Sequence, residues 1–197
     1  MVVSEEKRGS ATAVDDPGER QAVAAVLGGD SSAYDYLVSK HMRRCLSIAW
    51  GIVRDAAEAE DLAQEAFVRA YEKIGSFRMN EPFGPWIYRI VTNLSLDVAK
   101  HRSRVRNEDL GDDQQAARQE RGDVQVASNE IARRIDRAIE SLPEMQGIVV
   151  RLFLVEEFEH AEIAAMTGLT EGTIRSHLSH GRKKLQSILG DLQGEWR

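Results

Sequence analysis

Two stretches of the sequence carry several basic side chains and no acidic ones, a pattern suited to contacts with phosphate. The first is residues 98–107 and the second is residues 172–190; together they contain Lys100, Arg102, Arg104, Arg106, Arg175, Arg182, Lys183 and Lys184. The whole chain has a net charge of −6, but the local field decides affinity for nucleic acid. On charge alone, two DNA-binding surfaces and two solvated helix faces are equally favoured interpretations.

Residues around the second basic stretch have the spacing of a helix-turn-helix. Ala164 is small enough for a second helix to approach, Gly168 permits a left-handed turn, and Ile174 anchors the second helix in the core. In such a unit the second helix enters the major groove with its N-terminal residues at the base edges. Arg175 can bond guanine through two hydrogen bonds, worth about 1–3 kcal/mol of discrimination. An ordinary helical hairpin is the alternative.

Aromatic residues directly precede the first basic stretch. Phe83, Trp86 and Tyr88 gather where a loop rich in glycine and proline meets a predicted helix. Aromatic rings beside a cationic helix form a stacking platform for unpaired bases. The alternative is that Trp86 is a core residue, and we expect one ring of this group to be buried and another exposed.

Other residues capable of chemistry lack the partners that catalysis or metal binding needs. His177 and His180 are three residues apart without a third metal ligand nearby, and Glu156, Glu157 and Glu159 have no nucleophile or base beside them. We interpret the carboxylates as a solvated face and the histidines as polar residues near DNA. The sequence therefore predicts no enzyme, no cofactor and no metal site.

Helical elements must position these residues, and the composition allows them a core. The chain has 197 residues, of which 42% are hydrophobic, and no apolar run reaches the roughly 20 residues of a membrane span. The N-terminus lacks the apolar segment of a secretory signal. A single cysteine, Cys45, excludes an internal disulfide framework, and we expect it to be buried. These features predict a cytoplasmic protein.

The apolar residues recur at helical spacing throughout, so the fold class is predicted as all-α. The predicted helices cover residues 22–27, 32–53, 55–74, 86–104, 129–141, 144–156, 160–167 and 171–189, the last with Thr170 as its N-cap.

A polar segment divides these helices into two small domains, the second of which contains the helix-turn-helix. Residues 107–130 carry seven acidic and two basic side chains, which indicates a flexible linker. Its 24 residues average about 27 Å between their ends and reach at most about 80 Å. The predicted organisation is a disordered tail at 1–19, a domain at 20–106, a linker at 107–129, a domain at 130–190 and a tail at 191–197.

Three stretches resemble the extracytoplasmic-function (ECF) class of the sigma-70 family, which are bacterial transcription initiation factors. They are DAAEAEDLAQEAFVRAYEKIGSFR at 55–78, PWIYRIVTNLSLDVAKHR at 85–102, and SLPEMQGIVVRLF with EIAAMTGLTEGTIRSHLSHGRKKL within 141–185. They follow one another in the order and spacing of that family. The resemblance implies that residues 20–106 are region 2 and that residues 130–190 are region 4.

The resemblance assigns a role to each candidate surface. It implies docking on the β′ clamp helices of core RNA polymerase by Asp61, Gln64, Glu65 and Arg69. It implies capture and melting of the minus-10 element by Phe77, Arg78, Asn80, Phe83, Trp86, Tyr88, Arg89, Asn93, Lys100 and Arg102. It implies recognition of the minus-35 element by Thr170, Thr173, Arg175, Ser176, Ser179, His180, Arg182 and Lys183.

Two positions depart from the family pattern. The loop that the resemblance implies captures a minus-10 base, Phe77–Phe83, runs into the bulky segment EPFGP at 81–85, where relatives commonly have small polar residues. His180 stands where relatives often have arginine, so we expect one contact in the minus-35 element to be weaker or dependent on pH.

The partners that the resemblance implies are core RNA polymerase, through its β′ clamp helices and β flap, and promoter DNA. Many relatives also bind an anti-sigma factor, and membrane insertion is not expected. The main alternative is a stand-alone helix-turn-helix regulator whose first block dimerises or senses a signal. That alternative leaves the acidic face around Asp61 and the aromatic-basic helix without a use, and an enzyme is a distant third.

Overall fold

The computed structural model describes residues 16–109 and 130–190, and every regular element within them is helical. The first unit contains α1 (Pro17–Leu27), η1 (Ser31–Ala33), α2 (Tyr34–Val53), α3 (Ala56–Glu72), η2 (Ile74–Ser76) and α4 (Phe83–Asp109). The second contains α5 (Glu130–Glu140), α6 (Glu144–Leu154), α7 (His160–Thr167) and α8 (Glu171–Leu189). The all-α prediction is confirmed. Most of the predicted linker, the tail at 191–197 and residues 1–15 lie outside the described residues.

Helix α1 begins earlier than the sequence pattern predicted. Asp16 caps it by accepting a hydrogen bond from the backbone N–H of Gly18 at 2.7 Å, and Pro17 occupies the first position. Proline suits that position because its missing N–H would have no partner there. Residues 17–19 are therefore helical where the sequence predicted a disordered tail.

Helix α4 is longer at both ends than the predicted range 86–104. Gly84 and Pro85 indicated a loop, yet both lie in the first turn of the helix. The first turn tolerates them because its N–H groups have no partner within the helix. At its other end α4 continues to Asp109, three residues into the predicted linker.

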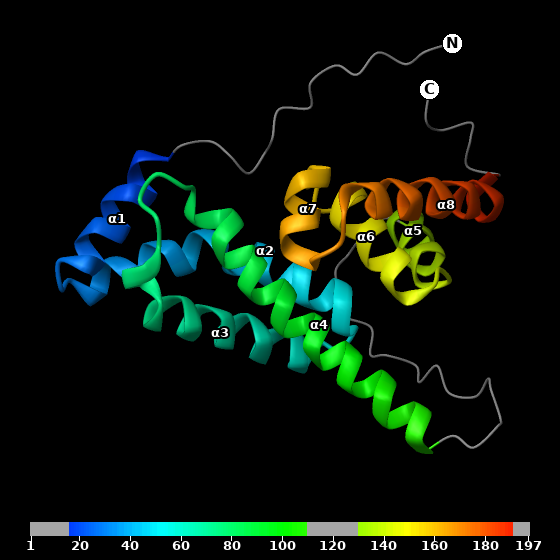
Figure 1. Cartoon of the computed structure of the whole chain (residues 1–197), viewed down its shortest axis with the longest axis horizontal. Coiled ribbons are helices and arrows are strands. Elements are labelled where there is room, and N and C mark those ends of the chain that lie inside the picture. Colours follow the sequence, from blue (N-terminus) through cyan, green and yellow to red (C-terminus); the bar gives the residue numbers. More distant parts are fainter. Residues whose placement is uncertain (1–15, 110–129, 191–197) are drawn as a thin grey trace, which may run out of the picture.

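The core of the first unit is formed where α2, α3 and α4 pack on one another (Figure 1). Small residues make the packing close: Ala59, Ala63, Ala66 and Ala70 are all buried and recur at helical spacing on α3. Cys45 is buried in this core as predicted. Burial raises the pKa of its thiol to about 12.

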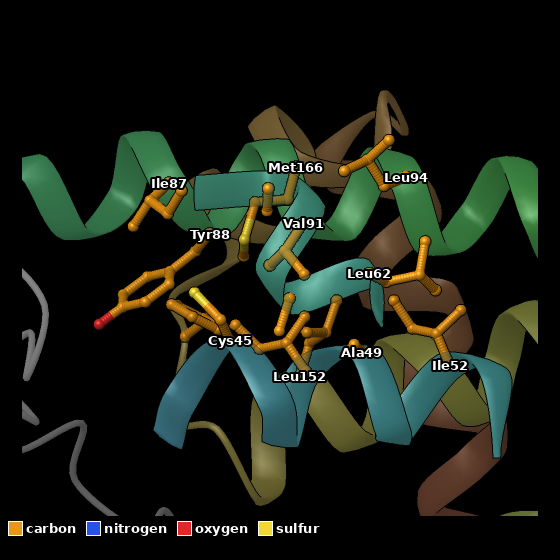
Figure 2. Close-up of a cluster of buried hydrophobic side chains, with 14 of the residues drawn as sticks. Cys45, Ala49, Ile52, Leu62, Ile87, Tyr88, Val91, Leu94, Leu152 and Met166 are labelled. Carbon is orange, nitrogen blue, oxygen red and sulfur yellow. The ribbon is translucent and has the colours of Figure 1, made fainter. Parts of the chain in front are cut away.

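The second unit packs directly against the first. Helix α7 packs on α4 and α6 contacts α2, and Figure 1 shows the second unit beside these two helices of the first. Leu152 from α6 and Met166 from α7 enter the same buried cluster as Ala49 and Val91 of the first unit (Figure 2). The sequence predicted two domains joined by a linker; in the structure they also share a buried surface.

Candidate nucleic-acid interface

The turn before α8 has the local geometry of a helix-turn-helix. Gly168 ends α7 in the left-handed conformation, with φ +74°. The hydroxyl of Thr170 then caps α8 by accepting from the backbone N–H of Thr173 at 3.2 Å. Both features match the sequence prediction, and each follows from a local preference of its residue type.

Helix α8 has one buried face and one polar face. Ile174, Leu178 and Leu185 are buried, and Gly181 faces α6 so closely that a Cβ there would meet the side chain of Val150. The opposite face exposes all eight residues predicted to read the minus-35 element: Thr170, Thr173, Arg175, Ser176, Ser179, His180, Arg182 and Lys183. The guanidinium of Arg175 lies 3.3 Å from the carboxylate of Glu171, and exposed ion pairs of this kind are weak.

The aromatic residues near α4 are mostly buried. Phe77 and Phe83 have ring centroids 5.8 Å apart, and the half-buried Trp86 lies 5.1 Å from Phe77 and 5.6 Å from Phe83. Phe77 and Phe83 flank the loop at 78–82 in the sequence, so the contact between their rings brings its two ends together. The structure thus separates the predicted minus-10 residues into a buried set, Phe77, Phe83 and Tyr88, and an accessible set, Arg78, Asn80, Trp86, Arg89, Asn93, Lys100 and Arg102.

Tyr88 is held in a buried network that sequence patterns did not indicate. Its hydroxyl lies 2.7 Å from Nδ1 of His41, whose Nε2 lies 3.0 Å from Glu19 Oε1. Because the carboxylate only accepts, Nε2 of His41 donates to it, and a ring protonated at Nε2 alone accepts from the Tyr88 hydroxyl at Nδ1. Burial raises the pKa of Tyr88 to about 12, so this hydroxyl keeps its proton. Only the tertiary structure reveals the network, because its members are 22 and 47 residues apart.

The first basic stretch is partly neutralised within the molecule. Arg102 forms an ion pair with Glu58 of α3 at 2.6 Å and donates to the backbone carbonyl of Val53 at 3.2 Å. Lys100 and Arg104 are exposed on α4. Arg102 therefore fixes the position of α4 relative to α3 in addition to its predicted role.

The predicted polymerase-docking residues share one exposed face of α3: Asp61, Gln64, Glu65 and Arg69. Glu65 and Arg69 form an ion pair along the helix at 2.7 Å. Two apolar residues that the prediction omitted, Val68 and Tyr71, are 53% and 43% exposed beside them. The sequence contained a signal for this surface, because helical periodicity places these apolar residues on the side of α3 that faces solvent.

Residues 16–109 and 130–190 contain no group of three or more His, Cys, Asp or Glu side chains that could hold a metal ion. None of the described helices is both long enough and apolar enough to cross a bilayer.

An all-α chain with a capped helix-turn-helix and a second, aromatic-basic helix has the architecture of a two-region DNA-binding protein. Family comparison agrees region by region: residues 37–105 match sigma-70 region 2 and residues 132–185 match sigma-70 region 4.

Relatives of similar length match almost the whole chain. The ECF RNA polymerase sigma factor SigW of Bacillus subtilis is 30% identical over 88% of this chain and 97% of its own length. RNA polymerase sigma-H factor of Pseudomonas aeruginosa is 30% identical over 90% of this chain and 96% of its own. The chain belongs to the ECF sigma factors of the sigma-70 family, which are transcription initiation factors, and the stand-alone regulator is not favoured.

Solved structures share the fold. CnrH, in complex with the cytosolic domain of CnrY, superposes with a TM-score of 0.63 at 22% identity, covering 88% of this chain and 98% of CnrH. The sigma factor RpoE from Bartonella quintana, in complex with the anti-sigma factor NepR, superposes with a TM-score of 0.61 at 24% identity. The match covers 80% of this chain and 96% of RpoE.

Proposed function

We propose that this chain binds bacterial core RNA polymerase through α3, reads the minus-35 element with α8 and opens the minus-10 element with α4 and the loop before it. The division of α8 into a buried apolar face and an exposed polar face carries this proposal. The eight exposed residues include donors for base edges and cations for phosphates, which are the two kinds of contact a recognition helix makes.

On α3, the proposed docking surface combines Asp61, Gln64, Glu65 and Arg69 with Val68. Val68 supplies an apolar contact among polar ones, and interfaces commonly surround a buried apolar centre with a polar rim. We therefore add Val68 to the docking residues.

On the minus-10 side, the accessible residues Arg78, Asn80, Trp86 and Asn93 are the proposed contacts with unpaired bases. Phe77 and Phe83 support them because they hold the loop in place. The protein is proposed to be a non-catalytic factor of the cytoplasm, where its proposed partners, polymerase and chromosomal DNA, are found. An anti-sigma partner stays a prediction from the family resemblance.

Run-off transcription with sigma-free core polymerase tests the whole proposal. We expect promoter-specific transcripts that require both the chain and the polymerase. Val68→Asp should reduce polymerase binding at least about tenfold, because it places a charge in an apolar contact. The matched control is Glu60→Asp on the same helix, and unaltered binding by the Val68 variant would remove this residue from the docking surface.

Two substitutions on α8 separate base recognition from phosphate contact. Arg175→Ala should weaken promoter binding by the holoenzyme by about 1–3 kcal/mol and relax specificity at one base pair. Lys183→Ala should weaken binding to all sequences alike. It should also lower the slope of log affinity against log salt concentration by about 1, because one phosphate contact is lost. Arg43→Ala, at an exposed position on α2, is the control. Equal loss of affinity on all sequences for Arg175→Ala would contradict its role in base recognition.

A further inference from the structure

His41 of α2 lies directly against the start of α4, the helix that follows the loop at 78–82. Its side chain is buried, and its ring lies 5.6 Å from the ring of Phe83 and 5.5 Å from the ring of Tyr88. A Cβ added at Gly84 would lie only 3.2 Å from Cε1 of His41. The first two turns of α4 therefore rest on this histidine.

The two ring nitrogens of His41 connect α4 to α1. Nδ1 lies 2.7 Å from the Tyr88 hydroxyl, and Nε2 lies 3.0 Å from Oε1 of Glu19. Glu19 is 7% exposed and Tyr88 is 5% exposed, so both hydrogen bonds are shielded from water. A buried polar network holds one arrangement of its side chains, because another arrangement would leave a buried polar group without a partner. The network therefore fixes the position of α4 relative to α1.

Helix α1 is itself anchored on α2 and reaches the other end of the loop. Lys40, next to His41, lies 2.7 Å from the Glu19 carboxylate and also pairs with Asp16, the residue that caps α1. Helix α1 also contacts η2, the element directly before the loop. It thus touches the chain ahead of the loop and, through His41, holds the chain that follows it.

From Phe83 the packing continues to Trp86, the half-buried ring among the proposed contacts with unpaired bases. Phe83 lies 5.6 Å from Trp86, and Phe77 lies 5.8 Å from Phe83 and 5.1 Å from Trp86. Rings packed at these distances fill the space between them, so a displacement of Phe83 has to move Trp86. A ring that is already held in place binds an extruded base more tightly, because less conformational freedom is lost on binding.

We propose that Glu19 and His41 are positioning residues for the opening of the minus-10 element. They hold Tyr88 and Phe83, and through Phe83 the ring of Trp86, in the arrangement that accepts an unpaired base. The inference rests on the proposed function, because it concerns the same minus-10 surface. It gives α1 a role in that function, although this helix lies outside the stretch that matches sigma-70 region 2.

Amide hydrogen exchange in the free full chain tests the positioning without reference to DNA. Glu19→Ala and Tyr88→Phe remove the two ends of the network. Tyr34→Phe is the matched control, because it removes a buried hydroxyl that donates to the backbone carbonyl of Phe67 at the same distance, 2.7 Å. Exchange of residues 77–86 should be at least about fivefold faster in both network variants and unaltered in the control. Unaltered exchange in either network variant would overturn the proposal.

The consequence for transcription is measured in the holoenzyme, at a promoter that run-off transcription has identified. Fluorescence of 2-aminopurine placed in the minus-10 element reports opening, and binding to a duplex that contains only the minus-35 element reports the rest of the chain. Both network variants should lower the equilibrium constant for opening about tenfold and leave minus-35 binding within about twofold of the parent. The control should alter neither. An equal loss in both assays would show a general structural role and would overturn the proposal.

A double variant tests whether Glu19 acts on the minus-10 surface through His41 and Tyr88. If the three residues act as one unit, Glu19→Ala combined with Tyr88→Phe should lower the opening constant no further than the more damaging single substitution. Losses that multiply would show independent effects and would overturn the connection. A parent holoenzyme that opens no promoter would overturn the proposed function, while the exchange measurement would still decide whether Glu19 and His41 position the loop.

Discussion

At the scale of single residues, the buried network around Tyr88 joins three helices of the first unit. Glu19 of α1 binds His41 of α2, which binds Tyr88 of α4. Lys40 also contacts Glu19 at 2.7 Å. Burial by itself disfavours the charged carboxylate, but hydrogen bonds from His41 and Lys40 outweigh it, so the pKa of Glu19 lies below its ordinary value of 4.5.

Glu19→Gln should therefore destabilise the protein in a manner that depends on pH. A lowered pKa in the folded state stabilises the fold above pH 4.5, and this contribution disappears as the pH falls through the folded-state pKa. We expect a loss of about 1 kcal/mol at pH 7 that shrinks progressively below pH 4.5, measured by urea unfolding. The exposed Glu60→Gln is the control. A difference that stays constant across this range would show that the charge of Glu19 is not involved.

Cys45 gives a second prediction at the residue scale. With a pKa of about 12 instead of 9.0, its thiolate fraction at pH 8 is about a thousandfold smaller than that of an ordinary thiol. Native protein should leave a thiol reagent unreacted while Ser187→Cys, exposed on α8, reacts completely. Denaturant should make Cys45 react at the ordinary rate, and rapid reaction in the native protein would contradict its burial.

At the scale of elements, the short turn between α7 and α8 sets the direction of α8, the proposed recognition helix. Gly168 has φ +74° and has no other atom near the place of its missing Cβ. The glycine is therefore required by backbone conformation and not by space. Thr170, two residues later, begins α8 with a side-chain cap.

Gly168→Ala should lower the free energy of unfolding by about 1–2 kcal/mol, the cost of a left-handed conformation for a residue with a Cβ. Gly75→Ala is the matched control, since its site is equally open and its φ is not positive. That variant should stay within about 0.5 kcal/mol of the parent. Equal effects of the two substitutions in urea unfolding would show that the turn does not depend on its left-handed glycine.

At the scale of the whole molecule, the two units share buried side chains, so each stabilises the other. Phe158 and Met166 of the second unit are buried near Tyr88 and Thr92 of the first, with 3.7 Å between Thr92 Oγ1 and Met166 Sδ. Coupled units unfold together, whereas independent domains unfold one at a time.

Calorimetry should consequently record one unfolding transition for the parent chain. Phe158→Ala removes an aromatic contact between the units and should divide this transition into two. Phe153→Ala is the control, because Phe153 stacks on His160 within the second unit at 5.2 Å and should shift the transition without dividing it. Two transitions in the parent chain would contradict the coupling.

The sequence by itself determined the helices, the family and the exposed face of α8. Gly168, Thr170 and the spacing of Ile174 from Leu178 act through local conformational preferences and helical periodicity, which depend on near neighbours in the chain. The approximate ends of α4 followed from the same signals, with an error at Gly84 and Pro85 because the first turn of a helix tolerates both residues.

The tertiary structure alone decided which aromatic residues are buried and how the units meet. From the sequence, one ring of the aromatic group was expected to be buried without indicating which, and Glu156 was interpreted as part of a solvated face; in the structure Phe83, Tyr88 and Glu156 are all buried. Their environments are made by residues far away in the chain: Tyr88 meets His41, and Glu156 meets Arg44 at a separation of 112 residues. Burial and pairing over such separations depend on the packing of helices in space, which no local pattern encodes.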